Sequence, residues 1–453
     1  MKPSVIFHEL FRLFPGLRTV DYRQKEDRIL SSNMAFSYLS KGLKAQQKYR
    51  TEPIWRSVGR ILLKNAEFSD RARAMVEAAY YHHNDGGIGA AAAKALYGGD
   101  VGASVTRLEQ QAACACAQFL AYGLELRERK EFTFAMVDLG TVFHRAIELF
   151  FRKMGERQMD FGTITEEERK ELTSLCVEEA TEQYGSNVLK SNARNAYMVQ
   201  RILRITDRTV WALGEQIKQS GFVPVGFEVE FRAADTDSLK LPLTSGETMY
   251  LNGKNDRGDL KEEEDRIYIN IIDYKSGSMA LDLTSAYYGL QIQLIFYMEA
   301  ALETVKKQYP DQEVLPGGVL YYNIKDPVVE KTGEMSEEMV RERMLEQLQM
   351  NGLMYPAVNE LPKKVRPVSQ KQFQTLQAHV MGEAVRLGNE IVRGETAPLP
   401  YKKGQRTACD YCQFRTVCGF DLKVPGYRYH RLKEWKPEEI WELLEEEEEL
   451  RNL

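Results

Sequence analysis

Residues 266–277 read Arg-Ile-Tyr-Ile-Asn-Ile-Ile-Asp-Tyr-Lys-Ser-Gly, and this stretch decides the fold of the region around it. The apolar, β-branched run predicts a buried strand that ends with Asp273 and Lys275. Because side chains alternate between the two faces of a strand, Asp273 and Lys275 are expected on the same side. A carboxylate and an ammonium group therefore leave the end of one strand together.

A second group of carboxylates lies just upstream, in residues 253–259, which read Gly-Lys-Asn-Asp-Arg-Gly-Asp. The acidic residues 261–265 predict the tip of a hairpin, which would fold Asp256 back toward Asp273. Two nearby carboxylates form a hard oxygen site for Mg²⁺, and a neighbouring lysine can orient water or offset charge at phosphorus. The pattern predicts metal-assisted phosphodiester hydrolysis.

Composition sets the limits of the remaining interpretation. A chain of 453 residues with 43% apolar content can bury a substantial core in one large or two to three smaller domains. Neither a transmembrane segment nor a signal-peptide core is found in the sequence, so we expect a cytoplasmic protein without membrane contact. The sequence contains no Gly-x-x-x-x-Gly-Lys-Ser/Thr, so ATP hydrolysis by this chain is not expected.

The net charge of -5 gives no general attraction to nucleic acid, so any such contact must come from a local basic patch. One candidate patch consists of Lys363, Lys364, Arg366 and Lys371. A solvated loop is the commoner explanation for such residues.

The order of expected elements indicates an α/β protein. We expect helices in residues 1–100 with a flexible Gly/Ala-rich connection at 85–93, a helix capped by Ser104 that runs toward Arg129, and a second helix starting near Gly140. Residues 222–275 are β-rich, and a helix at 286–305 and a strand at 318–324 follow, with further helices to Gly394. The predicted domains are a helical N-terminal segment at 1–100, a catalytic domain at 101–425 and an acidic helical tail at 426–453.

Cysteine spacing gives a second strong signal. Cys409, Cys412 and Cys418 fall within ten residues, so their thiolates can converge on one metal centre. A fourth ligand is missing nearby, and Cys114 or Cys116 could supply it from far upstream. Spacing leaves zinc, an iron–sulfur cluster and metal-free buried thiols as alternatives. Cys176, within an apolar run, is expected in the core.

Two helical motifs carry weaker signals. His144 lies one helical turn from Glu148 beside apolar residues, and a histidine in this setting is more often structural than a ligand. Gln293 and Tyr297 lie four residues apart on the helix after the hairpin. Core packing with a solvated glutamine is the default interpretation, and a helix edge that supports Lys275 and touches DNA is the alternative.

Together these residues resemble the C-terminal nuclease domain of the AddB family, the second subunits of bacterial AddAB helicase–nucleases, in the RecB-like branch of PD-(D/E)XK nucleases. The resemblance covers about residues 95–422. Its landmarks, in chain order, are residues 104–109, Cys114, residues 123–129, residues 140–144, Asp256, residues 273–276, Gly289, Gln293, Tyr297, Cys409, Cys412 and Cys418. The residues 273–276 and the split cysteine set are its most specific parts.

The resemblance implies an α/β fold with a restriction-endonuclease-like PD-(D/E)XK core, large helical elaborations and a 4Fe–4S cluster that joins distant parts of the domain. The implied cluster ligands are Cys114, Cys409, Cys412 and Cys418. The implied Mg²⁺ ligands are His144, Asp256 and Asp273, and the implied catalytic residues are Asp256, Asp273, Lys275, Gln293 and Tyr297. The implied function is Mg²⁺-dependent DNA cleavage with an AddA-type partner in double-strand break repair and recombination, with residues 1–100 as a remnant of a helicase-like region.

The sequence departs from the family at two motifs and in its length, which is too short for the large helicase-like N-terminal region of that family. The family usually has apolar residues where Asn255 and Gly258 stand, so we expect the strand carrying Asp256 to be bent or loosened. The upstream cysteine is usually followed by Pro-Phe, whereas Cys114-Ala115-Cys116 offers two ligands here. A silent DNA-binding scaffold and a stand-alone RecB-like exonuclease remain alternative functions.

Overall fold

The predicted strand is present in the computed structural model as β5 (Arg266–Lys275), and its two faces contribute to two different cores. Ile267, Ile269 and Ile271 lie in one core, whereas Tyr268 and Ile272 lie in the other. This alternation, with both faces apolar, is the pattern of a strand covered on both sides. The predicted hairpin is confirmed, because β5 pairs with the antiparallel strand β4 (Thr248–Glu263).

The structure describes residues 5–18, 31–46, 53–84, 86–98, 101–129, 136–189, 193–231, 239–330, 333, 335–356 and 362–451. Asp85 and residues 99–100, which fall in the expected connection and at the expected domain boundary, lie outside these ranges. The chain divides into two units. The first comprises Met1–His83 with Lys423–Gly426, and the second comprises Asn84–Leu422 with Tyr427–Leu453.

The first unit is helical in its described residues. Its helices are α1 (Val5–Leu13), α2 (Ser32–Gln46), α3 (Pro53–Lys64) and α4 (Ser69–Tyr80). A small core that includes Phe36, Leu39 and Leu62 joins α2, α3 and α4. None of the residues of α1 is buried.

The second unit is built on an eight-stranded mixed sheet, described in the order β1-β4-β5-β6-β7-β8 with β2 and β3 also paired to β4. The other strands are β1 (Val101–Ser104), β2 (Val223–Phe231), β3 (Lys240–Pro242), β6 (Glu313–Asn323), β7 (Asn351–Met354) and β8 (Val365–Pro367). β5 and β6 are parallel, with Lys275 opposite Asn323. The mixed α/β architecture agrees with the sequence prediction.

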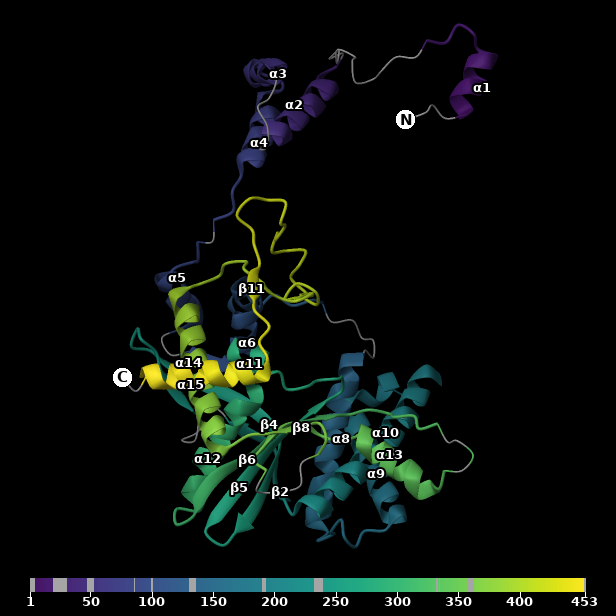
Figure 1. Ribbon diagram of the computed structural model, residues 1–453, viewed down its shortest axis with the longest axis vertical. Coiled ribbons are helices and arrows are strands. Elements are labelled where there is room, and N and C mark those ends of the chain that lie inside the picture. The colour runs from purple at the N-terminus through teal and green to yellow at the C-terminus, as the bar shows by residue number, and fades with distance from the viewer. Residues whose placement is uncertain are drawn as a thin grey trace. The chain divides into compact units, whose positions relative to one another are not determined.

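Helices cover both faces of this sheet (Figure 1). One face packs against α6 (Val105–Ala113), α11 (Leu283–Tyr287), α12 (Gln293–Gln308), α14 (Gln370–Arg393) and α15 (Pro437–Arg451). The other face packs against α8 (Met136–Glu156), α9 (Glu166–Leu189) and α10 (Ala193–Ser220). Two further helices are α5 (Ala90–Tyr97) and α13 (Glu337–Gln347). No described helix is both long enough and apolar enough to span a membrane.

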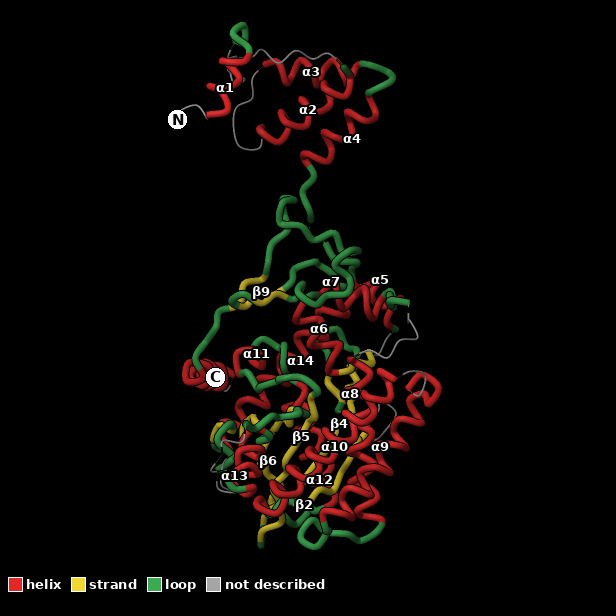
Figure 2. Tube along the Cα trace, turned by 90° about the vertical axis from the view of Figure 1, so that its right-hand side faces the viewer, coloured by secondary structure: helices red, strands yellow, loops and turns green. Residues whose placement is uncertain are grey.

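A smaller cysteine-containing region lies apart from the main sheet. It includes α7 (Ala115–Gln118), a π-helical turn at Phe119–Gly123 and a three-stranded sheet of β9 (Tyr401–Lys403), β10 (Arg406–Thr407) and β11 (His430–Leu432). Figure 2 shows β9 and its neighbouring loops beside α7, and the backbone N–H of Cys116 donates to the carbonyl of Ala397 at 3.2 Å. The buried residues Ala117, Leu120 and Phe414 form its core.

Three helix predictions were wrong in their extent. The helix capped by Ser104 ends at Ala113, because Cys114 is extended with φ −170°. The helix predicted at 286–305 is two helices, α11 and α12, which are separated by a segment in which Gly289 has a φ of +74°. The expected flexible connection at 85–93 extends too far, because residues 90–93 already belong to α5. Ser104 is the N-cap as predicted, since its side chain accepts a hydrogen bond from Arg107 N at 3.2 Å.

Candidate active site

Asp273 and Lys275 meet at the end of β5, as the strand period predicts. Lys275 Nζ lies 2.7 Å from Asp273 Oδ2, and the Asp273 side chain is buried. Gln293, at the start of α12, contacts both: its Nε2 donates to Asp273 Oδ1 at 3.0 Å and its Oε1 accepts from Lys275 Nζ at 3.3 Å. The three side chains therefore orient one another in a closed ring.

Tyr297 lies one turn further along α12 and contacts the neighbouring strand. Its hydroxyl accepts from the backbone N–H of Lys254 in β4 at 3.3 Å and lies 3.5 Å from Gln293 Nε2. A Cβ added at Gly253 would lie 2.5 Å from the Tyr297 ring, so only glycine allows the ring to lie against β4. Gly253 thus positions the helix that carries Gln293.

Asp256 occupies the fork where β4 and β5 separate. The β4–β5 ladder reaches as far as the pair of Arg257 with Ile272, and beyond it the Asp256 side chain accepts from the backbone N–H of Tyr274 at 2.7 Å. Its second oxygen lies 3.1 Å from Nδ1 of His144 on α8. Strand β4 is continuous through Asn255 and Gly258, so these residues do not interrupt it.

Glu228 on β2 joins this group, and the sequence interpretation missed it. The ligand atoms of His144, Glu228 and Asp256 all lie within 4.8 Å of one another. Glu228 falls opposite Asp256, between the cross-strand pairs of Phe227 with Arg257 and of Val229 with Asn255, and its φ is +51°. Two facing carboxylates repel each other unless a cation lies nearby, and Lys254 contacts Glu228. The detectable signal was a pair of glutamates, Glu228 and Glu230, in an otherwise apolar strand, but the sequence pattern does not single out Glu228.

Among the described residues, this compact group differs from the expected metal set, because it contains Glu228 in place of Asp273. Asp273 is turned toward Lys275 and Gln293 instead. Burial and the charge of Asp256 raise the pKa of Asp273 to about 6, although Lys275 opposes the shift. Burial disfavours charge on His144, but the Asp256 hydrogen bond and the surrounding carboxylates raise its pKa overall. The site thus carries a concentration of negative charge suited to a divalent cation.

Glu109 on α6 supports the same site from behind. Its Oε1 accepts from the backbone N–H groups of Ile292 and Gln293 at 2.9 and 3.1 Å, which satisfies the start of α12. Burial raises the pKa of Glu109 to about 7, although these two hydrogen bonds and Lys275 oppose the shift. Because α12 begins at Gln293, these N–H groups have no carbonyl partner within the helix and can donate to Glu109. The sequence predicted one uninterrupted helix here and therefore did not predict this contact.

The cysteines gather in the small region that contains α7. Cys114 and Cys116 pack with Cys412 and Cys418 around the core of Ala117, Leu120 and Phe414. Burial and the neighbouring thiols raise the pKa of Cys116 to about 12 and that of Cys409 to about 11. Deprotonated thiolates here would need a cationic partner. Cys176 is fully buried in the core beside α8, as predicted.

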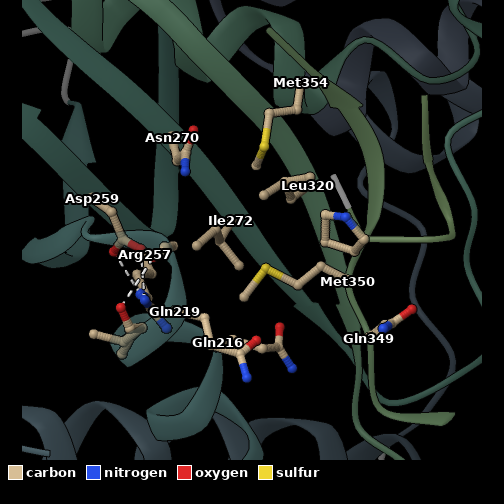
Figure 3. A pocket seen from close by; sticks show the side chains of 13 residues that line it. Gln216, Gln219, Arg257, Asp259, Asn270, Ile272, Leu320, Gln349, Met350 and Met354 are labelled. Carbon is tan, nitrogen blue, oxygen red and sulfur yellow. Dashed lines mark hydrogen bonds and ion pairs between the residues drawn. The ribbon is translucent and has the colours of Figure 1, made fainter. Parts of the chain in front are cut away.

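Two of the cavities on or near the sheet are lined in part by residues of β4. A cavity of about 530 Å³ is lined by His144, Glu228 and Asp256 and gives access to the candidate metal ligands. Another, of about 430 Å³, lies against Arg257 and Asp259 and contains none of the predicted site residues (Figure 3). There the Arg257 guanidinium donates to both carboxylate oxygens of Asp259, at 2.6 and 2.5 Å.

A family model described as the PD-(D/E)XK nuclease superfamily matches residues 102–419. The chain belongs to the PD-(D/E)XK nuclease superfamily. The match spans both the sheet with its polar fork and the cysteine-containing region. Asp256, within β4, and Asp273 and Lys275, at the end of the adjacent strand β5, thus lie in the matched PD-(D/E)XK region.

Curated relatives of this PD-(D/E)XK chain are named as subunits of an ATP-dependent helicase/deoxyribonuclease. They include proteins of Lachnoclostridium phytofermentans at 33% identity, Alkaliphilus metalliredigens at 32% and Thermoanaerobacter sp. at 30%. Each alignment covers 99% of this chain but only 41% or 42% of the relative. The chain therefore spans about two fifths of the length of the relatives it matches.

Proposed function

We propose that this chain is a Mg²⁺-dependent deoxyribonuclease domain that hydrolyses DNA phosphodiester bonds. The observation that carries the proposal is the pairing of a Lys275–Asp273–Gln293 ring with a His144–Asp256 contact at the fork of two strands. Family membership supports this assignment.

His144, Asp256 and either Glu228 or Asp273 would hold the metal, and their oxygen and imidazole donors fit a divalent cation. Mg²⁺, when bound, supplies polarisation of the phosphoryl oxygen and increased acidity of water. Lys275 places its ammonium beside Asp273, where it orients the attacking water and offsets charge that develops at phosphorus. Gln293 holds the Lys275 side chain in this position, and Tyr297 fixes α12 to β4.

We infer that the cysteines hold a 4Fe–4S cluster with Cys114, Cys409, Cys412 and Cys418 as ligands. Cys114, Cys412 and Cys418 pack against one small core, and Cys409, whose pKa is raised by burial, lies near enough to these three thiols for their charge to raise its pKa further. This convergence supports one shared metal centre. The resemblance of the split cysteine set to the AddB nuclease family favours an iron–sulfur cluster over zinc.

The names of the relatives support a setting for this activity. We propose that the domain works in the bacterial cytoplasm with an AddA-type helicase–nuclease subunit on DNA, in double-strand break repair and recombination. Those names combine a helicase and a deoxyribonuclease, and the site at Asp273 and Lys275 would supply the deoxyribonuclease activity.

The proposal is tested by incubating the purified chain with end-labelled linear DNA in Mg²⁺ or in EDTA. We expect cleavage in Mg²⁺ alone and its loss in Lys275→Met. Binding of DNA without any cleavage in Mg²⁺ or Mn²⁺ would show that the domain is a DNA-binding scaffold instead.

A further inference from the structure

A basic pocket lies next to the catalytic strand end and outside the metal-binding group. It has a volume of about 330 Å³, and Lys325, Lys364 and Arg366 line it. Lys364 and Arg366 belong to the basic patch noted in the sequence, whereas Lys325 joins them only in three dimensions. All other lining residues are uncharged, so three cations share one pocket without a carboxylate in its wall.

Two acidic residues close to these cations, Asp326 and Glu346, are engaged by other cations. Asp326 pairs with Arg204 and Arg208, and Glu346 pairs with Lys363 at 2.5 Å. Within the described part of the chain, none of the pocket's three cations lies within ion-pair distance of a carboxylate. Among the described residues, the three cations of the pocket therefore have no direct carboxylate partner.

Lys364 is held in place by neutral groups. Its Nζ donates to the backbone carbonyls of Glu346 and Gln347 at 3.2 and 3.3 Å. Partial desolvation and the charge of Lys325 lower the pKa of Lys364, and Glu346 offsets this only in part. The two ammonium groups repel each other, so both lysines are stabilised when an anion binds between them.

The pocket wall continues directly from the active site. Asn323 lies opposite Lys275 across the β5–β6 ladder, and it exchanges two hydrogen bonds with the backbone of Met279, at 2.8 and 2.9 Å. Asn351 also donates to the Met279 carbonyl at 3.1 Å. These contacts fix the segment after β5 as a wall of the pocket, so a strand that leaves the active site past Lys275 reaches the three cations next.

We propose that Lys325, Lys364 and Arg366 form a phosphate-binding subsite for the DNA strand that occupies the active site. This inference rests on the proposed nuclease function. Arg366 and Lys364 are exposed and Lys325 is half-buried, so the cations face an accessible groove, which suits a polyanion held at several points. Such contacts position a strand without reading its sequence.

The test is the salt dependence of binding to fluorescent single-stranded DNA in EDTA, where no cleavage occurs. Lys325→Ala/Arg366→Ala should weaken binding about tenfold and reduce the slope of log affinity against log salt by about 1.4, given about 0.7 for each of the two lost phosphate contacts. The matched control is Lys306→Ala/Arg73→Ala, which removes one lysine and one arginine from exposed positions outside the pocket. Circular dichroism checks that each variant is folded.

An unchanged slope and affinity in Lys325→Ala/Arg366→Ala would overturn the subsite, as would an equal loss in the control. If the wild type cleaves DNA while the pocket variant binds normally, the nuclease assignment stands and the subsite fails. If the pocket variant loses binding while the wild type never cleaves, the basic surface binds DNA but the nuclease assignment fails.

Discussion

Glu228 departs from ordinary strand geometry, and the departure places its carboxylate beside two candidate metal ligands. A non-glycine residue at a φ of +51° is held there by its surroundings, and such positions often occur at functional sites. His144 on α8 and Asp256 on β4 complete the group. Strand periodicity could not predict this arrangement, because the backbone at Glu228 departs from the period that such predictions use.

Glu228→Gln should weaken metal binding, because it removes a charged oxygen from the compact group and keeps the size of the side chain. We expect Mn²⁺ affinity, measured by electron paramagnetic resonance, to fall by at least about tenfold. Glu264→Gln, at the exposed hairpin tip, is the control. Unchanged affinity in Glu228→Gln, together with a loss in Asp273→Asn, would show that Asp273 is the third ligand.

Glu109 makes stability depend on pH. The pKa of Glu109 is about 7 in the folded protein, above its ordinary value of 4.5. The folding stability that protonated Glu109 contributes is therefore fully present below pH 4.5 and is lost as the pH rises through 7. Glu109→Gln should therefore stabilise the metal-free protein at about pH 8.5 by about 2 kcal/mol, a reduced figure because the side chain keeps partial exposure. Urea unfolding at about pH 5 and about pH 8.5 measures the difference. Equal pH dependence in both proteins would contradict the role of Glu109.

Helix α12 connects β4 to Lys275, the proposed catalytic lysine. Its N-terminus is satisfied by Glu109, its first residue holds Lys275 and Asp273, and Tyr297 fixes it to β4. The sequence predicted the β4–β5 hairpin and the shared helical face of Gln293 and Tyr297, because the apolar residues of these segments follow a regular strand or helix period. It did not predict the breaks at Cys114 and Gly289, since the residues around both continue a helical pattern.

Gly253→Ala should displace Tyr297, because the new methyl group would lie 2.5 Å from its ring. We expect a loss of about 1–3 kcal/mol in unfolding free energy and at least about a tenfold drop in DNA cleavage rate. Gly102→Ala, on the adjacent strand β1, has its nearest neighbour at 3.6 Å and serves as the control. Normal cleavage by Gly253→Ala would show that α12 need not contact β4.

The domain joins distant parts of its chain through the cysteine region. Cys114 and Cys116 precede most of the sheet in sequence, whereas Cys409, Cys412 and Cys418 follow it, yet Cys114, Cys116, Cys412 and Cys418 share a small core. Cysteine spacing predicted this convergence, because three thiols within ten residues leave a fourth position to be filled from elsewhere. Spacing did not distinguish Cys114 from Cys116, and both reach the region.

Anaerobically purified protein should contain iron and sulfide in nearly equal amounts, with the brown absorbance of a cluster. Cys114→Ala should release the iron and lower the unfolding free energy by several kcal/mol, because metal binding is coupled to folding. Cys176→Ala is the control for a buried cysteine outside the region. Iron loss in Cys116→Ala but not in Cys114→Ala would reassign the ligand, and zinc in place of iron would contradict the cluster.

The central claim is that the polar fork of β4 and β5 is a nuclease active site, and Asp273→Asn tests it most directly. The measurement is the rate of Mg²⁺-dependent cleavage of labelled linear DNA by the wild type, Asp273→Asn and the exposed hairpin variant Asp265→Asn. We expect Asp273→Asn to lose at least about a hundredfold in rate with an unchanged fold, and Asp265→Asn to match the wild type. Cleavage by Asp273→Asn at the wild-type rate would contradict the assignment.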